Sequence, residues 1–116
     1  METYEHNLTL LANIIQTHGA SAGIIGIHLE GPFISDQPGA VGCHPPAFTQ
    51  SPSIDLLKKW QKFANGNIVL ITIAAELDGS EELCQWAVKN NIRVSLGHQM
   101  ATGNFLCCCC GIGCCF

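Results

Sequence analysis

The sequence predicts an α/β fold built from parallel strands, and two observations support this prediction. Segments with helical periodicity alternate with short apolar runs rich in β-branched residues, in the order helix, strand, helix, strand, helix, strand. The 116 residues are 47% hydrophobic and only 12% charged, which suits one small domain with a buried interior. We therefore expect about three parallel β/α units.

The expected helices differ in how their ends are marked. Residues 4–18 place apolar side chains at helical spacing, and the Gly-Ala-Ser that follows is expected to end this helix. Residues 53–65 are expected to form a second helix with Ser53 as its N-terminal cap. Residues 79–91 are expected to form a third, which begins with acidic residues in its first turn, where the helix dipole favours them.

The expected strands cover residues 22–30, 67–76 and 92–98. The first is short, bounded by glycines and almost wholly apolar, so it is expected to be buried on both faces. In parallel sheets, functional residues gather at the carboxyl ends of the strands. Three strands cannot close an eight-stranded barrel, which takes about 250 residues. The chain therefore forms either a small open sheet or part of a larger fold.

Three titratable residues stand at the carboxyl ends of the expected strands. Glu30 stands at the carboxyl end of the first strand, Glu76 at that of the second and His98 at that of the third. A carboxylate and a neutral imidazole at neighbouring strand ends are ligands that zinc, iron or manganese accept. His28 shares a strand face with Glu30, so both can point into one site. The alternatives are that Glu30 begins a solvated loop, that His98 is a hydrogen-bonded loop residue, and that Glu76 starts a helix.

A long segment rich in proline and glycine, residues 31–53, separates the first strand from the second helix. Loops of this length without secondary structure of their own are usually functional. His44 lies in this loop, where it either swings over a bound anion or is a surface histidine. Because the loop leaves the first strand, we expect His44 to gather with Glu30 and His98 at one end of the sheet. Its neighbour Cys43 is a weak candidate for a nucleophile, because no third orienting group can be identified.

Charge and hydropathy exclude several classes of partner. The formal net charge is −4 and the five Lys and Arg are scattered singly, so we expect no nucleic acid partner. The N-terminus carries acids where a signal peptide would be positive, and no apolar run approaches the roughly 18 residues of a membrane span. We therefore expect a cytoplasmic protein with no membrane partner.

The cysteines divide the chain into two parts. Six of the eight lie in the last ten residues, and only Cys43 and Cys84 lie outside them. Four adjacent cysteines do not match the spacing of zinc sites, and disulfides are not expected in a cytosolic chain. We expect residues 103–116 to be a non-native or disordered tail, with a lipidated or metal-binding tail as the alternative.

Four motifs in residues 1–102 carry a family resemblance. They are "GIHLEGPFIS", "GAVGCHPP", "ITIAAE" and "IRVSLGHQMAT". In this order and at this spacing they resemble the barrel segment of the N-acetylglucosamine-6-phosphate deacetylases, which belong to the amidohydrolase superfamily. The resemblance implies that residues 1–102 are part of a (β/α)8 TIM-type barrel of a metal-dependent hydrolase.

The resemblance also implies roles for individual residues. The Glu of the family motif H-L-E-G-P-F and the His of S-x-G-H-x-x-A-T are metal ligands, which carry over to Glu30 and His98. The family's G-A-H-P segment contacts the amino-sugar phosphate, and Cys43 and His44 occupy its place, with Cys for the usual Ala. The L-A-P-E segment ends at Glu76, with Ala75 where the family has Pro.

The implied reaction is hydrolysis of the N-acetyl group of N-acetylglucosamine 6-phosphate to glucosamine 6-phosphate and acetate, in amino-sugar catabolism. A divalent zinc, iron or manganese ion would activate the attacking water. The family also uses an upstream His-x-His in its two-metal members, a downstream T-H-L-x-N-A-M segment and a later Asp as acid and base, and none of these motifs occurs in the 116 residues. We therefore expect this chain alone to be inactive. For the complete enzyme we expect a homodimer. The alternative is a non-catalytic fragment or pseudoenzyme that binds metal weakly or pairs with a complete subunit.

Overall fold

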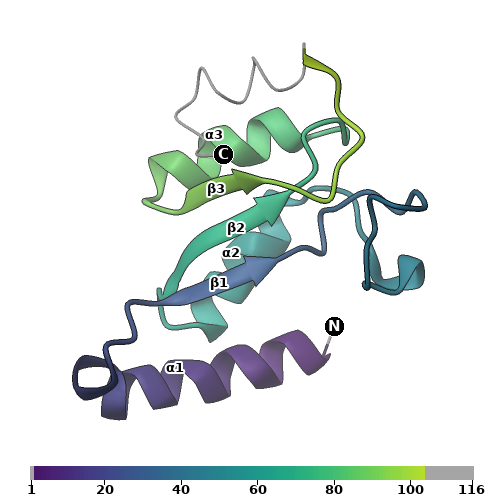
Figure 1. Ribbon diagram of the computed structural model, residues 1–116. Helices are drawn as coiled ribbons and strands as arrows, with labels where there is room; N and C mark the ends of the chain where they lie inside the picture. The colour runs from purple at the N-terminus through teal and green to yellow at the C-terminus, as the bar shows by residue number, and fades with distance from the viewer. Residues whose placement is uncertain (1, 104–116) are drawn as a thin grey trace.

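Three parallel strands form a sheet with helices against one of its faces in the computed structural model, which describes residues 2–103 (Figure 1). The strands are β1 (Ile27–Glu30), β2 (Ile68–Ile73) and β3 (Arg93–Leu96), and β2 lies between the other two. Both strand pairs are parallel, with Glu30 opposite Thr72 and Thr72 opposite Ser95. All three strands therefore end at the same edge, as the sequence predicts for consecutive β/α units.

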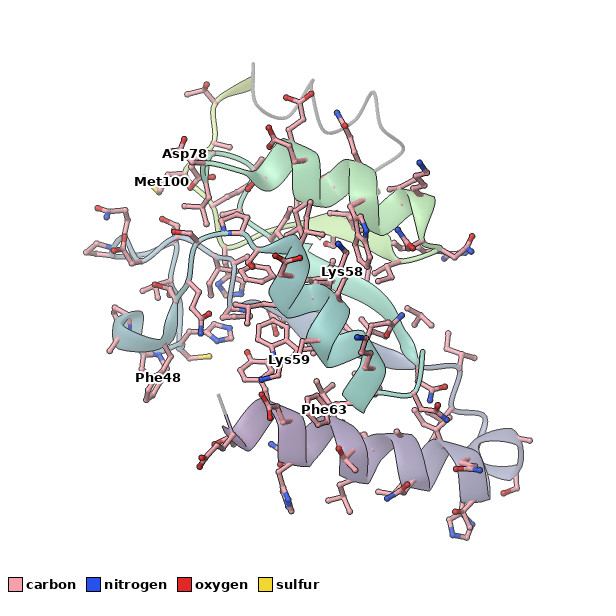
Figure 2. All side chains as sticks on the ribbon, turned by 180° about the vertical axis from the view of Figure 1, so that it is seen from behind. Phe48, Lys58, Lys59, Phe63, Asp78 and Met100 are labelled. Atoms are coloured by element: carbon pink, nitrogen blue, oxygen red, sulfur yellow. The ribbon has the colours of Figure 1, made fainter. Side chains whose placement is uncertain are left out.

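Helices connect the strands and cover the sheet from one side. α2 (Ile54–Phe63) links β1 to β2, and α3 (Ser80–Lys89) links β2 to β3. Seen from behind, α2 lies in front of the sheet, with Lys58, Lys59 and Phe63 along its length (Figure 2). The side chain of Ser53 accepts a hydrogen bond from the backbone N–H of Leu56, which confirms the expected cap.

The core lies between the sheet and these helices. Trp60 of α2 is fully buried and stacks between two rings, Tyr4 of the first helix at 4.8 Å and Phe33 of the loop after β1 at 5.6 Å. This aromatic stack joins the N-terminal helix to the segment that leaves β1. The other large, fully buried side chains among the described residues are Ile34, Leu57, Ile68, Ile71, Ile73, Leu83, Ile92, Val94 and Cys84.

The first helix, α1 (Glu2–Ala22), is longer than predicted. Gly19 and Ser21, expected to end it, lie inside it. The helix ends at Ala22 and is followed by Gly23, whose φ of +67° few other residues adopt. Gly19 is buried, so its small size serves packing rather than termination. α1 packs on α2, where Glu5 pairs with Lys59.

The first strand is shorter than predicted, and the prediction that both of its faces are buried is wrong. β1 begins at Ile27, which pairs with Ile68 at the start of β2, so residues 22–26 have no strand partner, and Ile25 is 92% exposed. Along β1, Ile27 and Leu29 are buried whereas the alternate residues are exposed. The reason is that, among the described residues, helices cover only one face of the sheet.

The predictions for the second and third strands and for the third helix are confirmed. The second and third strands lie within the expected ranges but are trimmed at their ends, and α3 begins with Glu81 and Glu82 in its first turn. The long loop contains one short 3-10 helix, η1 (Pro46–Phe48). The described residues form an open three-stranded sheet and do not themselves show a barrel. Apart from Gly103, the Cys-rich tail lies outside the described residues, so the prediction about it stays a prediction.

Candidate metal centre

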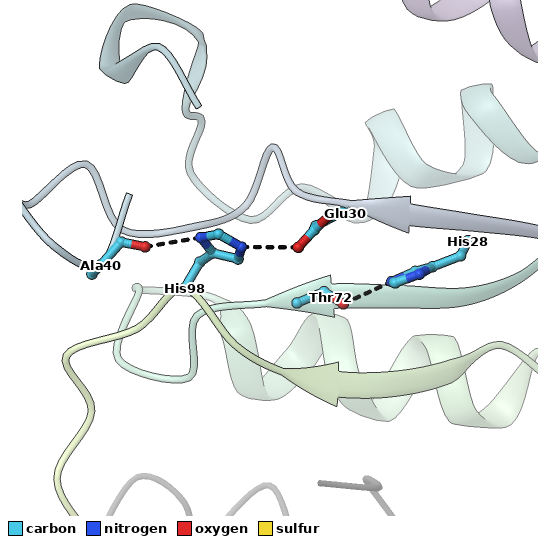
Figure 3. A network of polar contacts seen from close by, with 5 residues as sticks. All are labelled: His28, Glu30, Ala40, Thr72 and His98. Carbon is cyan, nitrogen blue, oxygen red and sulfur yellow. Dashed lines mark hydrogen bonds and ion pairs between the residues drawn. The ribbon is translucent and has the colours of Figure 1, made fainter. Parts of the chain in front are cut away.

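Glu30 and His98 meet at the carboxyl ends of the outer strands. Glu30 is the last residue of β1, and the backbone N–H of Gly31 donates to the carbonyl of Thr72 at 3.2 Å. His98 lies two residues beyond β3, where the backbone has a φ of +52°. Nε2 of His98 lies 2.9 Å from a carboxylate oxygen of Glu30 (Figure 3). The expectation that these two side chains gather at one edge is confirmed.

The partner of Nδ1 of His98 determines which nitrogen of the ring carries the proton. Nδ1 lies 2.9 Å from the carbonyl oxygen of Ala40, in the long loop. A carbonyl oxygen only accepts, so Nδ1 must carry the proton, and in the neutral ring Nε2 then presents a lone pair to the Glu30 carboxylate. Two acceptors at this distance require a proton or a cation between them. This arrangement is the one that fixes the tautomer of a metal-binding histidine.

The long loop brings His44 to the same place. Its ring lies edge-on to the ring of His98, with centroids 4.9 Å apart. One potential ligand atom from each of Glu30, His44 and His98 lies within 4.8 Å of the other two. The prediction that His44 gathers with Glu30 and His98 at one end of the sheet is therefore confirmed.

Gly42 allows the loop to approach His98 closely. Its φ is +60°, and a Cβ at this position would lie 3.0 Å from Cε1 and 3.3 Å from Nδ1 of His98. The backbone N–H of His44 donates to the carbonyl of Val41 at 3.2 Å, which closes the turn around Gly42. The turn therefore holds the His98 ring against the loop backbone.

Backbone hydrogen bonds connect the three segments that leave the strands. The N–H of Ser35 donates to the carbonyl of His98 at 3.0 Å, and that of Ala74 donates to the carbonyl of Phe33 at 2.9 Å. The N–H of Gly97 donates to the carbonyl of Ile73 at 3.0 Å. Neighbouring strand ends are thus tied directly to one another, which limits the movement of Glu30 relative to His98.

Three other residues singled out in the sequence lie outside this group of candidate ligands. Glu76 accepts the backbone N–H of Met100 at 2.7 Å, so it fastens the segment after β3 instead of joining the group around Glu30. His28 lies on the exposed face of β1 with Glu30, as predicted, but its Nε2 contacts the hydroxyl of Thr72 at 2.8 Å. Cys43 is exposed in the loop beside His44.

Sequence reasoning missed several parts of this centre. Thr72 was assigned only to a strand, Ala40 contributes through its backbone carbonyl, and Gln99 accepts the N–H of Ala75 through its side chain at 3.1 Å. Gly42 stands at the first position of the family's G-A-H-P segment, and that motif was the available signal for it. Backbone groups give no signal in a sequence, because every residue has them.

Comparison with curated proteins identifies relatives of one kind. No family model matches the chain. The chain is 39% identical over 85 residues to a protein of Bacillus subtilis, and 42% identical over 88 residues to one of Rattus norvegicus; both are named N-acetylglucosamine-6-phosphate deacetylase. Its homologues are N-acetylglucosamine-6-phosphate deacetylases. These two matches cover 73% and 72% of this chain, but only 21% and 20% of the relatives.

Solved structures agree with the sequence relatives. The N-acetyl-D-glucosamine-6-phosphate deacetylase of Mycobacterium smegmatis superposes with a TM-score of 0.86 at 27% identity, over 97% of this chain and 28% of that one. A variant of that enzyme, solved in complex with N-acetyl-D-glucosamine-6-phosphate, gives 0.85 at 27% identity over the same shares. The chain spans about a fifth of the length of the curated deacetylases that it matches. In residues 2–103, no helix is both long and apolar enough to cross a membrane.

Proposed function

We propose that this chain is part of a metal-dependent N-acetylglucosamine-6-phosphate deacetylase and that Glu30 and His98 bind one divalent cation at the mouth of a (β/α)8 barrel. The contact pattern of His98 supports this proposal most directly. Its Nδ1 donates to the carbonyl of Ala40, and its Nε2 is directed at the Glu30 carboxylate, both at 2.9 Å. The homologous deacetylases supply the substrate class.

The residues present fit a divalent cation by their chemistry. A carboxylate and an imidazole of fixed tautomer are the ligand types of catalytic zinc, and they also suit iron and manganese. Bound in this position, the ion would supply Lewis acidity and a water of lowered pKa for amide hydrolysis. Glu30 contributes negative charge, and the carbonyl of Ala40 keeps the His98 ring in orientation.

We further propose that Cys43 and His44 contact the substrate. His44 lies in the loop that crosses the strand ends, and its ring reaches that of His98. An imidazole there can donate a hydrogen bond to a hydroxyl or phosphate oxygen of the amino sugar. Its distance to Glu30 and His98 also allows a second role, as a third metal donor, because catalytic zinc usually has three protein ligands and a water.

The alternative function is that of a non-catalytic fragment or pseudoenzyme that binds metal weakly or pairs with a complete subunit. The small donor set favours it, since the described residues offer a group of three candidate ligands at this centre and two of them by family motif. A cytoplasmic location, a homodimer in the complete enzyme, and the absence of nucleic acid and membrane partners stay predictions.

The test compares this chain with a version completed by the upstream and downstream segments of a homologous deacetylase. Acetate release from N-acetylglucosamine 6-phosphate is measured with added Zn²⁺, Fe²⁺ or Mn²⁺. We expect the 116-residue chain to be no faster than metal alone, and the completed chain to be active. Glu30→Gln and His98→Ala should each abolish that activity, whereas the matched control His18→Ala, an exposed position on α1, should retain it. Turnover that survives both site substitutions would contradict the metal assignment.

A further inference from the structure

Thr72 occupies the position in the sheet that lies between the two proposed ligands. It is on the central strand β2, opposite Glu30 of β1 on one side and Ser95 of β3 on the other. Its side chain is nearly buried, with 6% of the residue exposed. Glu30 and His98 leave the two outer strands, so a residue of the central strand is placed to control the distance between them (Figure 3).

On the β1 side, Thr72 holds the residues on both sides of Glu30. Its hydroxyl contacts Nε2 of His28 at 2.8 Å, and its carbonyl accepts the N–H of Gly31 at 3.2 Å. One contact lies two residues before Glu30 and the other immediately after it. Because both contacts converge on one residue, the backbone that carries the Glu30 carboxylate is held relative to β2.

On the β3 side, the methyl group of Thr72 lies beneath the residue that precedes His98. A Cβ built on Gly97 would lie 3.0 Å from Cγ2 of Thr72, which is tighter than most real contacts. The N–H of Gly97 donates to the carbonyl of Ile73, the next residue along β2. Gly97 therefore rests on Thr72, and the height of the His98 backbone above the sheet depends on that methyl group.

We propose, given the metal centre proposed above, that Thr72 is a positioning residue that sets the separation of the Glu30 carboxylate and the His98 imidazole. Its hydroxyl and methyl group share one χ1 angle, and a β-branched side chain has few rotamers. The hydroxyl contact to His28 and the methyl contact to Gly97 are thus satisfied together by one conformation. Residues that orient metal ligands in this way typically change metal affinity by about 10 to 100-fold when they are removed.

Four variants of the full chain test this assignment. Thr72→Val keeps the shape of the side chain and removes the hydroxyl, and Thr72→Ser keeps the hydroxyl and removes the methyl group. Gly97→Ala adds the Cβ that meets the methyl group, and the double variant Gly97→Ala/Thr72→Ser removes that collision. Thr17→Val is the matched control, because its hydroxyl bonds a carbonyl within the exposed part of α1. His28 is exposed and can bond water instead, so Thr72→Val should still fold.

The affinity for Mn²⁺ is read from paramagnetic broadening of the His98 ring signals, with His18 of α1 as the internal reference. Mn²⁺ is used because thiolates prefer softer ions and the chain has eight cysteines. We expect Thr72→Val and Gly97→Ala to weaken binding about tenfold or more, and the double variant to bind more tightly than Gly97→Ala alone. Thr17→Val should bind like the parent chain.

A second measurement, made without metal, allows the metal centre and the positioning role of Thr72 to be refuted separately. The ¹⁵N shift of His98 Nε2 reports its contact with Glu30, and it should move in Thr72→Val and Gly97→Ala but not in Thr17→Val. If the parent chain does not broaden at His98, the metal centre is refuted. If the parent binds Mn²⁺ and the Thr72 and Gly97 variants match it in both affinity and ¹⁵N shift, the positioning role of Thr72 is refuted while the metal centre stands.

Discussion

Substitution of Gly42 by Ala should weaken metal binding through a single steric contact. A methyl group there would lie 3.0 Å from Cε1 and 3.3 Å from Nδ1 of His98, so the ring must move by a few tenths of an ångström. Nδ1 is also the atom that donates to the carbonyl of Ala40 at 2.9 Å, and movement of the ring lengthens that bond. We expect Mn²⁺ affinity to fall about tenfold, equivalent to about 1.4 kcal/mol.

The same substitution should also reduce stability, because Gly42 has a φ of +60°. An L-residue in this region costs roughly 1–2 kcal/mol. Gly39→Ala separates the two effects. Gly39 has a φ of +89°, so Ala is strained there as well, but a Cβ at this position meets nothing within 4 Å. Gly39→Ala should therefore lower the free energy of unfolding and leave the Mn²⁺ affinity unchanged.

Both variants are measured by chemical denaturation and by Mn²⁺ titration followed at the His98 ring signals. The reasoning predicts a loss of affinity in Gly42→Ala only, and a loss of stability in both. Parental Mn²⁺ affinity in Gly42→Ala would show that the loop does not hold the His98 ring. An equal loss of affinity in Gly39→Ala would show that general strain in the loop, and not the methyl contact, is responsible.

The remaining predictions concern the ligands, the N-terminal helix and the core. Glu30→Gln and His98→Ala should each remove the Mn²⁺ binding that is detected at the His98 signals. If His44 contacts only substrate, His44→Ala should leave the Mn²⁺ affinity unchanged and raise the KM of a completed enzyme. A loss of Mn²⁺ affinity of about tenfold in His44→Ala would instead make His44 a third metal donor. Burial raises the pKa of Tyr4 above 10.0, so the folded state favours the neutral phenol. The contribution of Tyr4 to the free energy of unfolding is therefore complete below pH 10. It is lost as the pH rises through the higher pKa of the folded state. Tyr4→Phe should reduce the alkaline loss of stability by the contribution of this one group. Because the chain has one Tyr, the near-ultraviolet absorbance of tyrosinate follows Tyr4 alone. An unchanged alkaline transition would count against the assignment. Leu57→Ala should lower the free energy of unfolding, measured by chemical denaturation, by roughly 2–5 kcal/mol, because Leu57 is fully buried in the core. A loss below about 1 kcal/mol would mean that the surrounding side chains fill the cavity left by the leucine side chain.

Local sequence patterns were sufficient for the order and type of the elements. Segments with helical periodicity that alternate with short apolar runs predicted parallel β/α units, and Ser53 marked the start of α2 correctly. Element ends were predicted less well because they depend on partners that are distant in the chain. β1 starts at Ile27 only because β2 starts at Ile68, and α1 passes through Gly19 because that glycine is buried by packing.

The sequence by itself determined which chemical groups are available and on which strand ends they lie. Glu30 and His98 follow strands in any parallel arrangement, so their presence at one edge was predictable from chain order. The same reasoning placed His44, in the loop that leaves β1, at that edge. Only the tertiary structure turned the His44 ring against that of His98, fixed the His98 tautomer through the carbonyl of Ala40, and placed Thr72 between the two ligand-bearing strands. The physical reason is that strand order and direction follow from local periodicity, whereas loop paths, backbone acceptors and side-chain contacts depend on how distant segments pack against one another.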